Sequence, residues 1–182
     1  MRWQSALFVG LTFGVLGCSS PAGPTGTAAN IVATGPQVLR ITLQAACTQL
    51  GQGVLPMVYT RVTVTTASTE WVASATSAIA GDVQIRFHQL GASVVAGAVP
   101  IAGSMTGTAV HLPELFAGPA WDVRAKVNSS ALVTGNAFAA GTFGSTTNGV
   151  DGVGDGALTL TDGAGNTCAG STFSWSLFPL PS

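Results

Sequence analysis

Apolar and polar residues alternate with a period of two in six segments of the chain, and this pattern predicts half-buried β-strands. In residues 39–44, Leu39, Ile41 and Leu43 lie on one face and polar side chains on the other. The other five segments are residues 62–65, 83–88, 121–127, 158–161 and 173–177. Weaker strands are expected around residues 92–98, 101–110 and 136–144, where Gly and Ala dilute the alternation.

Residues 70–80 allow two interpretations. Ser68 or Thr69 would cap an alanine-rich helical turn in this segment. The β-branched run before it, together with Thr76 and several serines, favours a strand, and we prefer the strand. No other window of the sequence has a convincing helical stripe.

Short turn signals separate the expected strands. They are Leu90-Gly91, Ala102-Gly103, Asn128-Ser129 and Asp162-Gly163. Asp-Gly between two alternating runs is the strongest hairpin signal among them. Short antiparallel strands joined by tight turns form a meander, which manages its edges by closing as a barrel or by packing as a sandwich. We therefore predict an all-β antiparallel meander, and prefer a barrel-like form to a two-sheet sandwich.

The first seventeen residues have the pattern of an export signal. Arg2 supplies a positive charge, and residues 6–16 form an uncharged apolar run that is shorter than the roughly 20 residues a membrane-spanning helix needs. The run ends in Val15-Leu16-Gly17-Cys18, which resembles the lipobox of bacterial lipoproteins. That resemblance implies cleavage before Cys18 and lipid on its sulfur, although a small residue is commoner than Leu16 at its position. The alternative is an ordinary signal peptide followed by an unrelated cysteine.

The resemblance to lipoproteins also predicts where the protein is held. Ser19 follows the cysteine, rather than the aspartate that resembles an inner-membrane retention signal, so we expect the outer membrane of the cell envelope. The domain organisation is then a signal peptide at 1–17, a lipidated cysteine with a flexible tether at 18–37, and one β domain at 38–182. A tether of this length holds a domain roughly 20–25 Å from the bilayer.

The charge distribution excludes one class of partner. Charged residues make up 7% of the chain, against about 25% in typical soluble domains. The basic residues outside the export signal are scattered along the sequence: Arg40, Arg61, Arg86, Arg124 and Lys126. Nucleic-acid binding needs clustered basic residues, so we predict no nucleic-acid partner. We expect a membrane contact through the lipid anchor, and the sequence does not identify a protein, glycan or small-molecule partner.

Two cysteines remain once Cys18 is assigned to lipid. Cys47 and Cys168 are an even pair in an oxidising compartment, which favours a disulfide between them. Such a bond would close a loop of about 120 residues and stabilise the fold by roughly 4–5 kcal/mol on the chain-entropy model. The alternative is two free buried thiols.

The chain carries little of the chemistry that catalysis or metal binding requires. Residues 103–107 resemble a serine elbow in composition, but the serine is one position off. His88 and His111 have no second ligand at a telling spacing, so we predict no metal, no cofactor and no enzymatic activity. Residues 148–156 contain Asp151 and Asp155 among glycines; we interpret them as a solvated glycine-rich loop rather than a calcium site.

The tryptophans bear on whether the domain has a binding surface or a packed core. Trp121 and Trp175 fall on the apolar side of their strands, so core packing is a better interpretation than a surface platform for Trp71, Trp121 and Trp175. We expect a lipid-anchored envelope protein with a non-catalytic structural or partner-binding β domain. The alternative is a carrier whose barrel encloses a small apolar ligand in a cavity of about 300 Å³ or more. Its lining would include Ile85, Phe87, Trp121 and Trp175.

Overall fold

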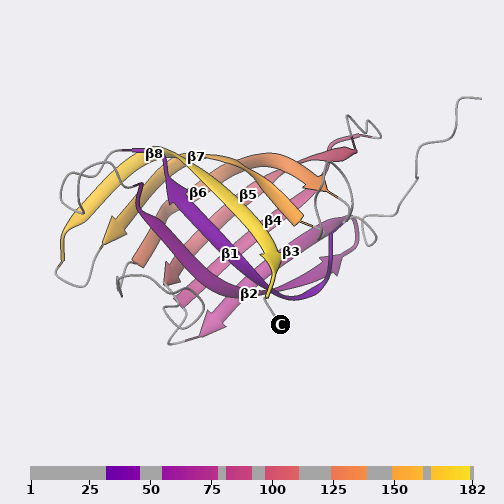
Figure 1. The fold of residues 1–182 in the computed structure, drawn as a ribbon, viewed down its shortest axis with the longest axis horizontal. Coiled ribbons are helices and arrows are strands. Elements are labelled where there is room, and N and C mark those ends of the chain that lie inside the picture. Colours follow the sequence, from indigo (N-terminus) through magenta and orange to yellow (C-terminus); the bar gives the residue numbers. More distant parts are fainter. Residues whose placement is uncertain are drawn as a thin grey trace, which may run out of the picture.

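The computed structural model describes residues 32–45, 55–77, 81–91, 97–110, 124–138, 149–161 and 165–180. These residues form a single closed barrel of eight antiparallel strands (Figure 1). The strands are β1 (Gly35–Leu43), β2 (Met57–Ala67), β3 (Glu70–Ser77), β4 (Gly81–Gln89), β5 (Ala98–Val110), β6 (Arg124–Phe138), β7 (Gly149–Thr161) and β8 (Thr167–Pro179). Both the all-β prediction and the preference for a barrel are confirmed.

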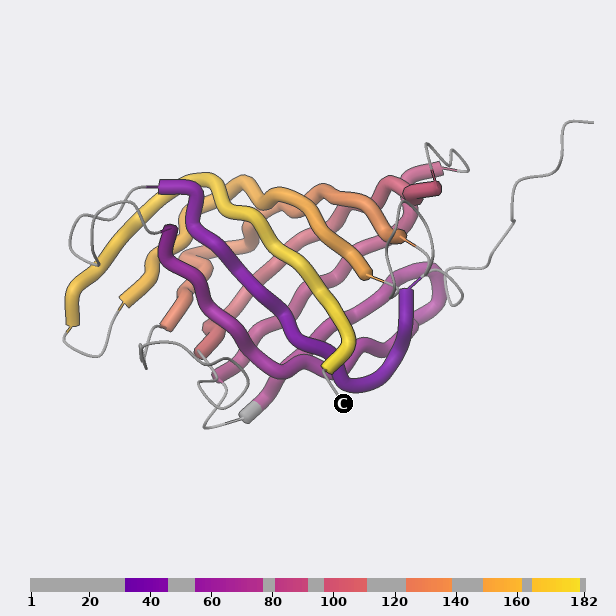
Figure 2. The backbone as a smooth tube through the Cα atoms, viewed as in Figure 1, coloured from indigo at the N-terminus to yellow at the C-terminus, as the bar shows by residue number. Residues whose placement is uncertain are grey.

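Each strand pairs with the next one along the chain, and β1 then pairs with β8 to close the barrel. At this seam Leu39 lies opposite Leu177, Ile41 opposite Trp175 and Leu43 opposite Phe173. Figure 2 shows the two strands side by side, indigo against yellow, although they come from opposite ends of the chain. Closure pairs each of the eight described strands with a neighbour on both sides, so the barrel has no free edge strand.

The up-and-down path gives the barrel two distinct ends. The proximal end contains the start of β1 at Gly35, the Ser68-Thr69 turn between β2 and β3, and the end of β8 at Pro179. The distal end contains the end of β1 at Leu43 and the point where β3 gives way to β4. Because β1 enters and β8 leaves at the proximal end, both described chain ends lie there.

The inside of the barrel is apolar and the outside is polar. Along β4, Val83, Ile85 and Phe87 are buried, while Asp82 and His88 are exposed. Among the described residues, no helix long and apolar enough to cross a membrane is found.

Aromatic rings and glycines fill the interior together. Three buried rings each lie opposite a glycine on the next strand: Phe87 faces Gly103, Trp175 faces Gly152 and Phe173 faces Gly154. The fit is closest at the last pair, where a Cβ built on Gly154 would lie 2.1 Å from Cζ of Phe173. A glycine within a strand has no side chain, so it leaves space for an aromatic ring from the neighbouring strand.

Two of the predicted turns are wrong, because both dipeptides lie within strands. Ala102-Gly103 lies within β5, where Gly103 is needed because a Cβ there would lie 1.8 Å from the carbonyl oxygen of Arg86. Asn128-Ser129 lies within β6, at an irregularity where the register with β7 shifts between Val127 and Leu132. Both dipeptides have turn-like composition, but one marks a close strand approach and the other a bulge.

Two other predictions concern the ends of strands. The preference for a strand over residues 70–80 is confirmed by β3, and Ser68 and Thr69 form a hairpin turn instead of a helix cap. β1 begins at Gly35, before the domain boundary expected at residue 38. Gln37 is buried and donates a hydrogen bond to the carbonyl of Ala33, and Val32 packs into the core. The residues that precede β1 therefore cover the proximal end.

Candidate functional site

The barrel interior was the expected place for a ligand cavity. Ile85, Phe87 and Trp175 are all buried there, as the cavity hypothesis required, whereas Trp121 lies outside the described residues. The rings of Trp71 and Phe87 stack with centroids 5.6 Å apart, and Phe87 meets Trp175 at 5.8 Å. Since β4 and β8 are not neighbours in the sheet, the last contact crosses the barrel and fills its interior at this level. Core packing is confirmed for Trp71 and Trp175.

The two buried indoles differ in their hydrogen bonding. Nε1 of Trp175 donates to the carbonyl oxygen of Val153 at 3.3 Å. Nε1 of Trp71 is buried without an acceptor. A buried donor without a partner costs about 1–3 kcal/mol of folding free energy. The N–H group of Trp71 could therefore still donate a hydrogen bond inside the barrel.

Residues 148–156, expected to form a loop, belong instead largely to strand β7, which starts at Gly149. The loop prediction was wrong because these glycines allow close packing: a Cβ at Gly154 would meet the Phe173 ring, and a Cβ at Gly152 would lie 2.0 Å from the carbonyl oxygen of Thr134 on β6. Asp151 and Asp155 both lie on the exposed outer face, although neighbouring groups partly desolvate the Asp151 carboxyl. No group of three or more His, Cys, Asp or Glu side chains within the described ranges is placed to hold a metal ion.

A polar row crosses the outer wall at the seam of the barrel. Arg40 on β1 lies opposite Ser176 on β8, which in turn lies opposite Asp151 on β7. Burial raises the pKa of Asp151 above its usual value, and the positive charge of Arg40 partly offsets the rise. Ser176 is 7% exposed, and its Oγ has no hydrogen-bond partner.

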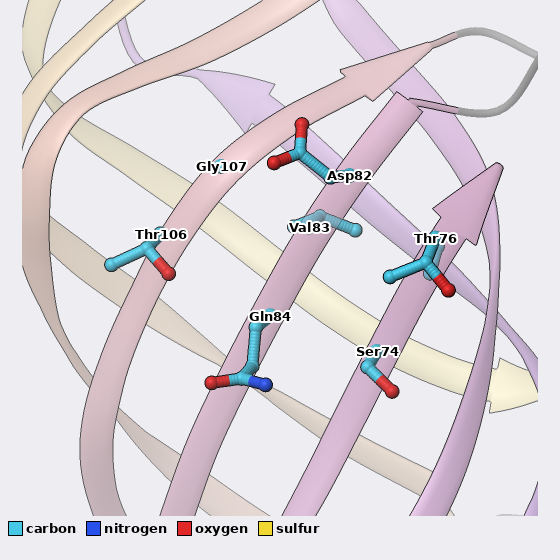
Figure 3. Close-up of a pocket in the computed structure, with 8 residues that line it drawn as sticks. Ser74, Thr76, Asp82, Val83, Gln84, Thr106 and Gly107 are labelled. Carbon is cyan, nitrogen blue, oxygen red and sulfur yellow. The ribbon is translucent and has the colours of Figure 1, made fainter. Parts of the chain in front are cut away.

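A shallow hollow of about 270 Å³ lies on the outer wall of β3, β4 and β5. Its polar lining comes from three adjacent strands: Ser74 and Thr76, Asp82 and Gln84, and Thr106. Figure 3 shows these side chains around the hollow, with Val83 directed behind the sheet. We refer to it as the β3–β5 hollow. It lies towards the distal end, because Thr76 and Asp82 face each other beside the β3–β4 connection.

A bulge in β5 shapes the floor of the hollow. The register of β5 with β6 shifts between Met105 and Gly107, and Gly107 has a φ of 109°. A Cβ at Gly107 would lie 2.4 Å from the carbonyl oxygen of Asp82, so a side chain is excluded there by both backbone conformation and space. Bulges of this kind are common beside functional sites because they redirect neighbouring side chains.

The hydrogen bonds around Gln84 orient its amide. Nε of Arg86 donates to Oε1 of Gln84 at 3.0 Å, and Nη1 of Arg86 lies 3.6 Å from Oε2 of Glu70. With its oxygen bound to Arg86, the Gln84 amide has its NH₂ group left to donate elsewhere. Asp82 contributes acceptors only, and the hydroxyls of Ser74 and Thr106 donate and accept.

The cysteines and histidines expected to matter can be placed only in part. Cys18, Cys47 and His111 lie outside the described residues. Cys168 is the second residue of β8, at the distal end, with 7% of its surface exposed. His88 is exposed on the outer face, as predicted. A Cys47–Cys168 disulfide therefore stays a prediction.

The described residues define a small up-and-down β-barrel with an aromatic and glycine core and a polar outer wall. Comparison with protein-family models, with curated proteins and with solved structures finds no match for the chain.

Sequence reasoning did not single out the β3–β5 hollow. Its five polar residues lie in or directly beside three segments, 70–80, 83–88 and 101–110, that the sequence predicts separately as strands. A usable signal is their order along the chain, because an antiparallel meander places three such consecutive strands side by side. The bulge at Gly107, which opens the floor, has no comparable signal, because glycine recurs throughout this chain.

Proposed function

We propose that this chain is a lipid-anchored protein of the bacterial cell envelope whose barrel is a non-catalytic structural or partner-binding domain. The lipobox-like segment ending in Cys18 carries the proposal. Lipid on its sulfur would attach the chain to the outer membrane, and residues 19–31 would connect the lipid to the barrel.

The arrangement of the barrel supports this proposal. The described chain enters at the proximal end, where Val32 packs into the core and Gln37 bonds the carbonyl of Ala33. A tether attached there would direct the proximal end towards the membrane and the distal end away from it. The described residues at the distal end, such as Leu43 and Cys168, would then lie on the side of the barrel that faces away from the membrane.

The proposed disulfide fits the same arrangement. β1 and β8 are paired up to Leu43 and Phe173, and the backbone N–H of Gln44 donates to the carbonyl of Thr172 at 3.1 Å. Cys168, the second residue of β8, lies at the same distal end as Leu43, the last residue of β1. We therefore propose that the two cysteines join the distal ends of β1 and β8, across the seam of the barrel.

A non-catalytic role is supported by what the described surface offers. The β3–β5 hollow has one carboxylate, Asp82, and no histidine, cysteine or lysine among its lining residues. General acid–base catalysis needs a positioned acid and base with tuned pKa values. Polar side chains displayed on a rigid barrel wall are better suited to binding than to proton transfer.

Fatty-acid labelling tests the anchor. The full chain is expressed in a Gram-negative host supplied with an alkynyl fatty acid, and the label is detected on the purified protein. Wild type and a matched Cys47→Ser variant should incorporate the label, and Cys18→Ser should not. Inhibition of the lipoprotein signal peptidase should cause the uncleaved form to accumulate. A wild-type chain without label, or equal labelling of Cys18→Ser, would refute the proposal.

A second candidate function is a carrier for a small apolar ligand with one hydrogen-bond acceptor. The buried and unpartnered Nε1 of Trp71 favours it, because such a ligand would accept that hydrogen bond. The ring contact of Phe87 with Trp175 weighs against it, because these side chains occupy the interior. Native mass spectrometry of the purified protein decides between them. A copurifying apolar molecule that is lost in Trp71→Phe would support a carrier.

A further inference from the structure

The β3–β5 hollow has a defined shape and composition. Ser74, Gln84 and Thr106 lie in one row across three strands, and Thr76 and Asp82 form the next row towards the distal end. Alanine, valine and glycine make up the rest of the lining: Ala75, Val83 and Gly107. A volume of about 270 Å³ is close to the lower limit of ligand pockets, roughly 300 Å³. The hollow therefore suits a small molecule or one unit of a longer chain.

The hydrogen-bonding groups of the hollow restrict its ligand. Asp82 accepts hydrogen bonds, the NH₂ of Gln84 donates, and the three hydroxyl groups of Ser74, Thr76 and Thr106 do both. The lining contains a carboxylate and no cation, which disfavours phosphates and other anions. Its rim is polar, which disfavours an apolar ligand. A neutral ligand with several neighbouring hydroxyl groups matches both the donors and the acceptors.

The orientation of Gln84 adds specificity. Its Oε1 accepts from Nε of Arg86, and Arg86 is itself close to the carboxylate of Glu70. These contacts occupy the amide oxygen of Gln84 and leave its NH₂ group to donate a hydrogen bond to a ligand. Asp82, on the same strand, offers an acceptor. A donor and a carboxylate side by side can bind two adjacent hydroxyl groups of one sugar ring.

We propose that the β3–β5 hollow is a binding site for a neutral carbohydrate, with Asp82 and Gln84 as its main polar contacts. The partner of the barrel would then be an envelope glycan or another neutral saccharide. The inference rests on the partner-binding form of the proposed function and does not depend on the lipid anchor. Because the hollow is open and shallow, binding to one sugar unit is weak, with a Kd of about 1 mM.

Saturation-transfer NMR with the purified chain tests the proposal directly. The probes are chitotetraose, maltotetraose and cellotetraose, with inorganic phosphate as an anionic comparison. At least one saccharide should receive saturation, and phosphate should not shift the amide resonances of residues 74–84 or 106. Asp82→Asn and Thr106→Val should each weaken saccharide binding, Asp82→Asn by about tenfold or more because it removes a hydrogen bond to a charged group.

Matched variants on other strands control for non-specific effects. Asp155→Asn on β7 and Thr172→Val on β8 change exposed side chains of the same types away from the hollow, and should leave binding unchanged. Circular dichroism and melting temperature establish that every variant is folded. The proposal is overturned if no saccharide binds at about 10 mM, or if binding survives Asp82→Asn and Thr106→Val unchanged. Those outcomes leave the fatty-acid labelling of Cys18 unaffected, so the two proposals fail separately.

Discussion

Gly154→Ala is expected to destabilise the barrel through a single steric conflict. The added Cβ would lie 2.1 Å from Cζ of Phe173, and 2.3 and 2.6 Å from the two Cε atoms of the same ring. Phe173 is fully buried, so the ring has little space into which to move. No positive φ is recorded at Gly154, and the conflict is therefore one of space rather than of backbone conformation.

The size of the effect follows from overpacking. Forcing a methyl group into a filled core costs typically about 1–3 kcal/mol. For a domain of this size each kcal/mol lowers the melting temperature by roughly 2–4 °C, so Gly154→Ala should melt about 2–12 °C below wild type. Phe173→Leu removes all three ring atoms that the new methyl group meets. The double variant should therefore be more stable than the sum of the two single changes predicts.

Urea denaturation of the four proteins in this cycle measures the coupling between the two sites. We expect a coupling free energy of about 1 kcal/mol or more in favour of the double variant. Gly149→Ala, on the same strand, is the matched control, because its Cβ would meet nothing closer than the carbonyl of Leu177 at 3.6 Å. If Gly154→Ala is as stable as Gly149→Ala, or if the two changes add without coupling, the glycine–aromatic packing of the barrel is refuted.

Three further predictions concern other buried or paired groups. Trp71→Phe should destabilise the protein by less than Trp175→Phe in urea, by about 1 kcal/mol, since only the Trp175 N–H has an acceptor to lose; a larger loss at Trp71 would contradict this. Burial raises the pKa of Asp151, so the folded protein favours the protonated carboxyl. The protonated carboxyl therefore contributes stability below the pKa that Asp151 has in the unfolded chain, and this contribution is lost as pH rises through the higher pKa of the folded protein. Asp151→Asn should therefore gain stability relative to wild type in melting experiments as pH rises from about 3 to 6, and a difference independent of pH would count against a raised pKa. Cys47→Ser should cost about 4–5 kcal/mol under oxidising conditions and nothing once wild type is reduced; an equal loss in both conditions would exclude a Cys47–Cys168 disulfide.

The strands could be predicted from the sequence where one face is apolar and the other polar. Residues 39–43 and 83–87 are examples, because large side chains alternate with polar ones along β1 and β4. The pattern failed where the inward residues are small. In β7, Gly152 and Gly154 occupy inward positions, so the strand lacks the apolar side chains that would identify it. A glycine that makes space for a ring on another strand cannot be distinguished locally from a glycine in a loop.

The candidate site was less predictable than the fold. Asp82 and Gln84 are two residues apart on one strand, and the sequence indicates only that both face outward. Thr106 joins them through the β4–β5 register, which depends on where the intervening connection ends. The shape of the hollow depends on the bulge at Gly107, a feature of pairing between strands. Binding sites on the wall of a barrel are defined by neighbours across strands, and an alternating pattern along one strand contains little of that information.

The seam between β1 and β8 has a consequence for how the chain folds. Its pairings, such as Leu39 with Leu177, join residues from almost opposite ends of the described chain, whereas the other pairings join consecutive strands. Contacts so distant in sequence form slowly, because a long loop must close before they give any stabilisation. Until the seam forms, β1 and β8 each have an open edge on which a second chain can pair. The rate of seam closure therefore sets the protein concentration above which association between chains competes with folding.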